Sequence, residues 1–122
     1  MTPIGTVEVR RYHADLWVVA LVGEHDLSTA DVIKERLTDV HSQGTRVILD
    51  LSQASFVDTS VIAVIVRERE RAASSEEDAL VVVAPTGSQP RRALELVQLS
   101  GVLLAESRAE AYDAMQQGRD GA

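Results

Sequence analysis

The 122-residue sequence contains no cysteine, and its aromatic residues are one tryptophan, one phenylalanine and two tyrosines. The lack of cysteine excludes disulfides, thiol nucleophiles and thiolate metal ligands, and it is typical of a protein from a reducing compartment such as the cytoplasm. No apolar run approaches the roughly 20 residues that cross a bilayer, and the first residues lack the pattern of a secretion signal. We therefore expect a cytoplasmic protein without a membrane segment or membrane partner.

Basic residues are also in the minority, at 12 Lys and Arg against 19 Asp and Glu, which gives a formal charge of −7. A nucleic-acid binder needs a basic face, so this balance argues against nucleic acid as a partner. A phosphate-binding loop of the Gly-rich Lys-Ser/Thr type and a Ser-centred nucleophile elbow are both absent. The sequence therefore favours a binding or switching module over an enzyme, with no catalytic residue to name.

Metal binding has little support in the sequence. His13, His25 and His41 lack the spacing of metal ligands, and we interpret them as surface or turn residues. The remaining candidate is a carboxylate cluster of three aspartates, which no further motif supports: Asp26, Asp50 and Asp58. We expect no metal and no cofactor.

Apolar segments and helical patterns alternate along the chain after an initial hairpin. This order predicts a single α/β domain over residues 1–122, with a mixed sheet of four to five strands, about four helices and a frayed tail from about residue 118. The expected strands cover residues 6–12, 16–22, 46–51, 80–84 and 102–104. A polar loop is expected at 23–27 and an acidic loop at 73–78.

Capping residues mark where the expected helices begin. Ser28, Ser88 and Ser107 each precede a helical pattern, and Glu110 completes a capping box with Ser107. Stops are expected at Gly44, Gly101 and Gly118. Val97 and the following core set are expected to face inward: Val18, Ala20, Ile33, Leu37, Val47, Leu49, Leu51, Val81, Val83, Leu94, Ala111 and Met115.

The stretch from Arg46 to Arg71 organises the rest of the chain. It reads as a buried strand, a polar turn at 52–55, and then Asp58-Thr59-Ser60 followed by an apolar run at 61–66 and a charged tail. The β-branched run favours a strand, whereas its length with the charged tail favours a helix, which we adopt. The Asp and the two hydroxyls are good N-caps, and a hydroxyl there is also a place where helix N–H groups and dipole would stabilise an added phosphate.

These residues resemble the STAS domain, and within it the bacterial anti-sigma-factor antagonists. The resemblance covers nearly the whole chain. It is carried by residues 21–30 (LVGEHDLSTA), by residues 47–60, which end in Phe56-Val57-Asp58-Thr59-Ser60, and by Pro85, residues 91–96 (RRALEL) and Gly101-Val102. It implies a non-enzymatic switch in bacterial stress-responsive transcription.

In such families the unmodified antagonist binds an anti-sigma factor that is also a serine/threonine kinase, and this binding releases a sigma factor. The kinase phosphorylates the hydroxyl that follows the Asp, and a phosphatase reverses the modification. The resemblance therefore implies that Thr59, or Ser60 beside it, is the phosphoacceptor. It also implies a partner-binding set around this turn, near which the loop with Asp26 lies in the family fold: Asp26, Asp58, Thr59, Ser60, Val61 and Ile62.

Three positions depart from the family pattern. Val61 and Ala63 stand where the family usually has glycine, and Thr59 stands where serine is commoner. Glycine allows a partner to approach the backbone, whereas Val61 adds a stiff branched side chain that we expect to hinder docking. The competing interpretation is a STAS adaptor or scaffold subunit, in a signalling, transport or lipid-handling complex, that binds its partner without a phospho-switch.

Overall fold

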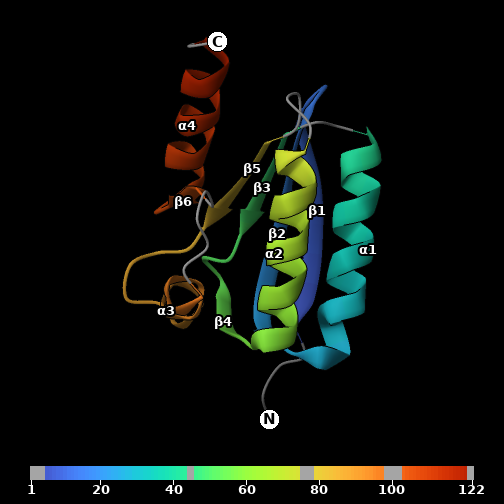
Figure 1. Ribbon diagram of the computed structural model, residues 1–122, viewed down its shortest axis with the longest axis vertical. Helices are drawn as coiled ribbons and strands as arrows, with labels where there is room; N and C mark the ends of the chain where they lie inside the picture. The colour runs from blue at the N-terminus through green and yellow to red at the C-terminus, as the bar shows by residue number, and fades with distance from the viewer. Residues whose placement is uncertain (1–4, 44–45, 75–78, 98–102, 121–122) are drawn as a thin grey trace.

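The computed structural model describes residues 5–43, 46–74, 79–97 and 103–120. Strands and helices alternate in the following order: β1 (Thr6–His13), β2 (Leu16–His25), α1 (Leu27–Gln43), β3 (Arg46–Asp50), β4 (Ala54–Val57), α2 (Thr59–Ala73), β5 (Ala79–Val83), α3 (Gln89–Leu96), β6 (Leu103–Ala105) and α4 (Arg108–Asp120). The predicted α/β class with a mixed sheet is confirmed (Figure 1). No helix in the described part of the chain is long and apolar enough to cross a membrane.

The sheet runs in the order β1-β2-β3-β5-β6. The β1–β2 pair is the antiparallel hairpin expected from the sequence, and the other pairs are parallel. β4 pairs in parallel with the end of β2, beyond the residues that pair with β3. It raises the strand count to six, one above the expected range.

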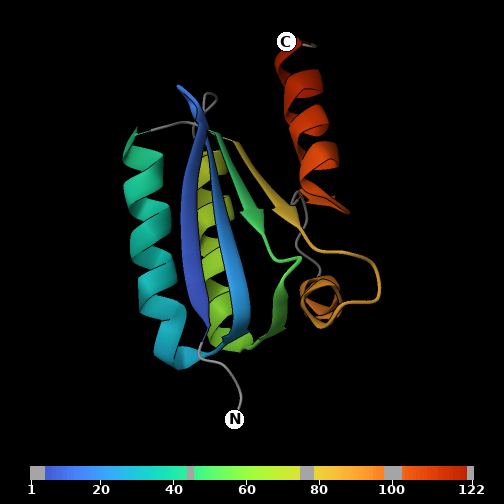
Figure 2. The ribbon, with the colours of Figure 1, turned by 180° about the vertical axis from the view of Figure 1, so that it is seen from behind.

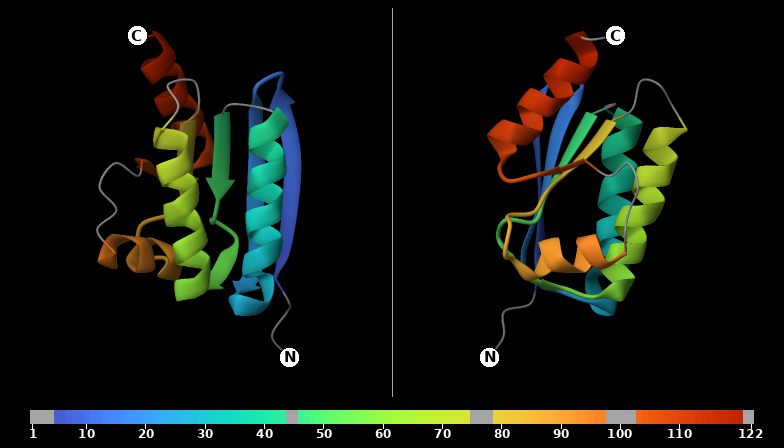
Figure 3. Two further views of the ribbon diagram at one scale, coloured as in Figure 1. Left: turned by 45° about the vertical axis from the view of Figure 1, so that its right-hand side comes forward. Right: turned by 60° about the vertical axis from the view of Figure 1, so that its left-hand side comes forward.

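Two apolar clusters hold helices on opposite faces of the sheet. α1 and α2 lie side by side on one face, whereas α4 lies on the other (Figures 1 and 3). Alternate residues of the central strands supply both clusters: Val47 and Leu49 face α1 and α2, while Ile48 faces the α4 side. The expected core set apart from Val97 is confirmed, because each of its members is at most 6% exposed.

The turn predicted at residues 52–55 is wrong in part, because Ala54–Val57 forms β4. This strand has only four residues, of which the first and the last are buried. Such a short segment shows too few apolar positions in the sequence to be recognised as a strand. The predicted loop at 23–27 is likewise wrong for its first residues, since β2 continues to His25 and provides the strand with which β4 pairs. Gly23, at φ 88°, lies where that pairing shifts register.

Three helix boundaries differ from expectation. α1 begins at Leu27 instead of after Ser28. α3 ends at Leu96, which leaves Val97 46% exposed instead of facing inward. α4 continues through Gly118 to Asp120, because a glycine within a helix costs only about 1 kcal/mol and does not force a stop. The stops predicted at Gly44 and Gly101, most of the acidic loop and Val102 lie outside the described residues.

Two of the three histidines are not surface residues. His25 is 0% exposed, and its Nε2–H donates to Val22 O (3.1 Å), while its Nδ1 lies 3.0 Å from Thr29 Oγ1. The side chain of His41 is 1% exposed, and its Nδ1 lies 3.2 Å from Glu68 Oε2, which joins α1 to α2. A polar residue at the end of a strand or on an amphipathic helix carries no sign of which neighbour will cover it, so the sequence did not indicate either burial.

Candidate functional site

The candidate site lies at the edge of the sheet where β2 and β4 end together. His25 pairs with Val57, and the Asp58 N–H donates to His25 O (3.2 Å). The next residue after each strand is an aspartate, Asp26 or Asp58, and each aspartate precedes a helix. The strand pairing therefore brings the N-termini of α1 and α2 to one edge of the sheet. This placement is what the resemblance implied for Asp26 and the Asp58-Thr59-Ser60 turn.

Asp58 caps α2 through its side chain. One oxygen, Oδ1, accepts from the N–H groups of Ser60 (3.0 Å) and Val61 (3.3 Å) and from the Ser60 hydroxyl (2.5 Å). The cap residue itself is extended, with φ −98° and ψ −175°, as N-cap residues usually are. The interpretation of Asp58 as a helix cap is therefore confirmed, and any role in switching adds to that structural role.

Asp26 repeats this arrangement at the start of α1. Its Oδ1 accepts from the Ser28 N–H (2.8 Å) and the Ser28 hydroxyl (2.5 Å). These hydrogen bonds, the hydroxyl first and then the backbone N–H, hold the pKa of Asp26 below its ordinary value. The carboxylate therefore stays ionised beside the Asp58 turn, and the capping role predicted for Ser28 belongs to Asp26.

The two candidate hydroxyls differ in availability. Thr59 is exposed, whereas Ser60 is half-buried and its hydroxyl donates to Asp58. A kinase must reach the acceptor oxygen and leave room for the transferred phosphoryl group. Of the two, Thr59 has the geometry of an accessible acceptor.

Val61 and Ala63 occupy different environments although both replace family glycines. Val61 is 0% exposed and belongs to the core cluster under α1 and α2, whereas Ala63 is exposed. The expectation that the Val61 side chain obstructs a partner is wrong for this structure, because the side chain points into the core. Ile62 is 5% exposed and contributes its surface to the groove described next.

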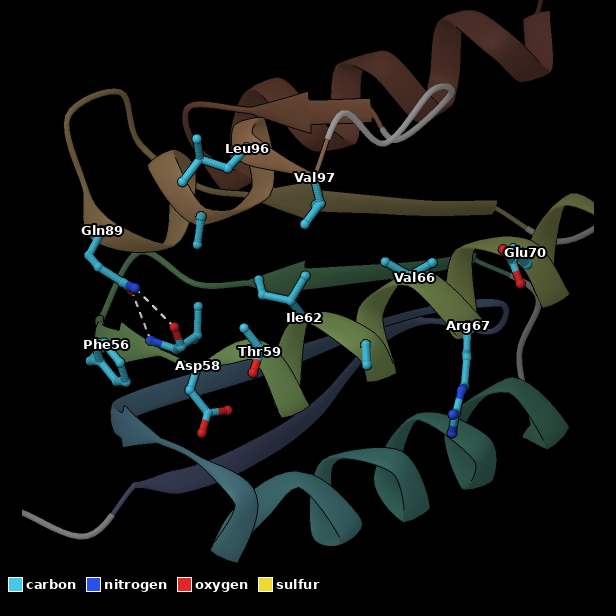
Figure 4. Close-up of a pocket in the computed structure, with 13 residues that line it drawn as sticks. Phe56, Asp58, Thr59, Ile62, Val66, Arg67, Glu70, Gln89, Leu96 and Val97 are labelled. Atoms are coloured by element: carbon cyan, nitrogen blue, oxygen red, sulfur yellow. Dashed lines mark hydrogen bonds between the residues drawn. The ribbon is translucent and has the colours of Figure 1, made fainter.

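An apolar groove of about 740 Å³ runs between α2 and α3 and reaches Asp58 and Thr59 at one end (Figure 4). Three exposed apolar side chains lie along it: Phe56 at 41%, Leu96 at 84% and Val97 at 46%. The polar residues Gln89, Arg67 and Glu70 complete its lining. A patch of exposed apolar groups beside an accessible hydroxyl is suited to contact with another molecule.

Gln89 fixes α3 beside β4 at one end of this groove. Its Oε1 accepts from the Val57 N–H (2.9 Å) and its Nε2 donates to Val57 O (2.9 Å), so that α3 is tied to β4. Sequence reasoning missed Gln89, Phe56 and Leu96 as site residues. Leu96 could have been found from the sequence. Leu94 was expected to face the core, and residues two positions apart on a helix lie on different faces, so Leu96 had to be an exposed apolar side chain.

The third aspartate of the candidate carboxylate cluster, which we did not expect to bind metal, lies elsewhere. Asp50 is 3% exposed and its Oδ2 accepts from Arg108 Nε (2.5 Å), which joins β3 to α4 on the other face of the sheet. No group of three or more potential metal ligands occurs among residues whose positions the structure describes. Asp26 and Asp58, in contrast, both follow strands that end at the site.

The model of the STAS domain family matches residues 7–111 of this chain. No curated protein sequence matches the chain significantly. Among solved structures, it is similar to an anti-sigma factor antagonist from Mycobacterium paratuberculosis, with a TM-score of 0.83 at 23% identity over 93% of this chain and 95% of the other.

Two further solved structures are similar to the chain. The phosphorylated form of the Bacillus cell fate determinant SpoIIAA has a TM-score of 0.68 at 18% identity, over 90% of this chain and 99% of the other. The murine anion transporter Slc26a9 has a TM-score of 0.63 at 14% identity, over 95% of this chain but 22% of the other. At these identities the likeness concerns the fold.

Proposed function

The chain belongs to the STAS domain family, and from that premise we propose that it is an anti-sigma-factor antagonist whose activity is switched by phosphorylation of Thr59. The unmodified protein binds an anti-sigma factor that is also a serine/threonine kinase, and this binding releases a sigma factor. The phosphorylated protein no longer binds, and a phosphatase restores it. In this role the chain is a regulator and not an enzyme.

The observation that carries the proposal is the position of Thr59. It is an exposed hydroxyl at the first residue of α2, beside the apolar groove, while the neighbouring Ser60 hydroxyl is engaged by Asp58. The order Asp-Thr-Ser resembles the acceptor turn of the antagonists, with threonine at the position where serine is commoner. The structure of SpoIIAA in a phosphorylated form supports the same kind of modification in a similar fold.

A phosphate on Thr59 would act on the surface more than on the fold. It adds about −1.5 to −2 charges at neutral pH. The N–H groups and dipole of α2 stabilise this charge, whereas the carboxylates of Asp58 and Asp26 repel it. These effects oppose each other within the folded protein, so we expect little change in stability.

A partner docked on the groove would meet the phosphate directly. The apolar side chains of Phe56 and Leu96 favour a partner that covers them, because burying them removes apolar surface from water. Such a contact also excludes water from the Thr59 end of the groove, where a dianion is costly to desolvate. A coupling free energy of the usual size for such switches lowers the affinity roughly 10²-fold.

A second candidate function is a constitutive STAS adaptor. It is favoured by the groove, which supplies an apolar contact surface whether or not Thr59 is modified. In Slc26a9 the matched region is about a fifth of a larger chain, which supports the use of this fold as one part of an assembly. In that case the groove holds its partner permanently and Thr59 is only the first residue of α2.

Measuring the mass of the intact protein by mass spectrometry distinguishes the phosphorylation switch from the constitutive adaptor. The protein is incubated with ATP and an anti-sigma kinase of this class, and we expect a gain of about 80 Da, the mass of one phosphate. Thr59→Ala should abolish the gain and keep binding, Ser60→Ala should keep the gain, and Thr59→Glu should weaken binding. If wild type gains no mass and Thr59→Glu binds like wild type, the adaptor function replaces the switch.

A groove variant tests the docking surface independently. Leu96→Asp places a charge on the most exposed apolar side chain of the groove without touching Thr59. We expect weaker binding with an unchanged melting temperature, because the side chain is 84% exposed. Wild-type affinity in this variant would exclude the groove from the interface. Val32→Asp, at a 40% exposed position on α1, is the matched control.

A further inference from the structure

The outer edge of β1 is an uncovered sheet edge that no proposed switch residue occupies. Among the described strands, β1 pairs only with β2. Seven of its eight residues are exposed. Figure 2 shows β1 and β2 from the side of the sheet opposite α1 and α2, with no helix drawn over β1. An edge strand of this length presents unpaired backbone groups that another strand can bind.

Two of the charged side chains on β1 are exposed and have no partner among the described residues. Glu8 and Arg10 are both exposed, and outside the undescribed segments neither forms a salt bridge or a side-chain hydrogen bond. Both lie on the α4 side of the sheet, because Arg10 pairs with Val18 of the cluster on that side and Glu8 follows the same alternation. Val9, between them, lies on the opposite side and is 38% exposed.

Charged residues on an edge strand usually prevent self-association, because in many registers each charge meets its own copy. Here the order Glu8-Val9-Arg10 has the opposite effect in one register. When two copies of β1 pair antiparallel about Val9, Glu8 of each copy lies opposite Arg10 of the other. Pairing about Glu8 or Arg10 instead would place like charges opposite each other, which is unfavourable.

The backbone supports the same centre. β1 pairs regularly with β2 from Thr6 to Arg11, and the register shifts only between Arg11 and His13. The segment Val7–Arg11 is therefore regular and symmetric about Val9. Two such segments can form a continuous antiparallel ladder across a twofold axis, the commonest symmetry of homodimers.

We propose that this protein forms a homodimer by antiparallel pairing of β1 with β1 of a second copy, centred on Val9. The two Glu8–Arg10 pairs set the register on one face of the sheet. On the other face, Val9 packs against Val9 of the second copy. The two sheets become one continuous sheet. The site residues at the starts of α1 and α2 contribute nothing to this pairing.

Charge reversal gives a test with an internal check. E8R places two arginines opposite each other in the dimer, and R10E places two glutamates opposite each other. We expect each variant to raise the dimer Kd about tenfold or more, measured by light scattering over a concentration series. Mixing the two variants should restore association as a heterodimer, because every Arg then meets a Glu, and native mass spectrometry identifies it by mass.

Two controls complete the experiment. Asp113→Arg makes the same charge reversal at an exposed position on α4 and should dimerise like wild type. Thr59→Glu should also dimerise like wild type, which separates this inference from the switch. The proposal is overturned if wild type stays monomeric at every concentration, if either single variant dimerises as well as wild type, or if the mixture forms no heterodimer.

Discussion

Replacing Val61 by glycine restores the family residue at the start of α2, and the structure predicts that this change destabilises the protein. The side chain is 0% exposed and packs in the cluster between the sheet and helices α1 and α2. The glycine variant therefore creates a cavity. It does not clear a path to the backbone for a partner.

The magnitude follows from three losses. Removing three buried carbons costs about 0.8 kcal/mol each. The cavity adds to this cost because the surrounding core relaxes only in part. Glycine is also a poorer helix former than valine, by about 0.3–0.5 kcal/mol. Together these losses lower the free energy of unfolding by about 3–4 kcal/mol, and the melting temperature by roughly 10–15 °C for a chain of this size.

Ala63→Gly is the matched control, because it replaces the other family position on an exposed part of the same helix. We expect it to cost only about 1 kcal/mol, the helix propensity difference. Urea unfolding followed by circular dichroism measures both variants. A cost for Val61→Gly below about 1 kcal/mol, or equal to that of Ala63→Gly, would refute the assignment of Val61 to the core.

Three further predictions concern the core, the cap and the link between α1 and α2. Leu49→Ala, at a 0% exposed position of β3, should cost about 2–5 kcal/mol in a denaturant melt, and a cost under about 1 kcal/mol would contradict its burial. Asp58→Ala should cost about 1 kcal/mol through loss of the α2 cap, whereas Asp58→Asn, which keeps an accepting oxygen, should cost less. Burial raises the pKa of Glu68, but hydrogen bonds from His41 and Arg71 more than offset this, so its pKa lies below the ordinary 4.5. The ionised form of Glu68 therefore stabilises the fold above pH 4.5, and this contribution to the free energy of unfolding is lost as the pH falls through the lowered pKa. Glu68→Gln should make the free energy of unfolding fall less steeply in this acidic range. An unchanged fall would argue that the contact between Glu68 and His41 does not stabilise the packing of α1 on α2.

Much of the architecture followed from local pattern. Runs of apolar residues such as residues 80–84 are long enough to identify buried strands, and residues such as Ser88 and Ser107 mark helix starts through their own side chains. The β-branched run after Ser60 was ambiguous by itself. Its charged continuation favoured a helix, and the structure confirms α2.

The errors occurred where a residue's environment depends on distant segments. β4 is a strand because the end of β2 lies beside it, and His41 is buried because α2 covers it with Glu68. Neither partner is adjacent in sequence. Val61 and Ala63 look alike in a sequence comparison, and only the packing of α2 distinguishes a core residue from an exposed one.

The sequence by itself determined the α/β class, the strands and helices at their approximate places, and the Asp58-Thr59-Ser60 turn, because each depends on residues close together in the chain. Only the tertiary structure decided which hydroxyl is accessible, that the helices capped by Asp26 and Asp58 begin at one edge of the sheet, and that Phe56 and Leu96 line one groove. The physical reason is that exposure and proximity are set by strand pairing and helix packing, which join segments distant in sequence.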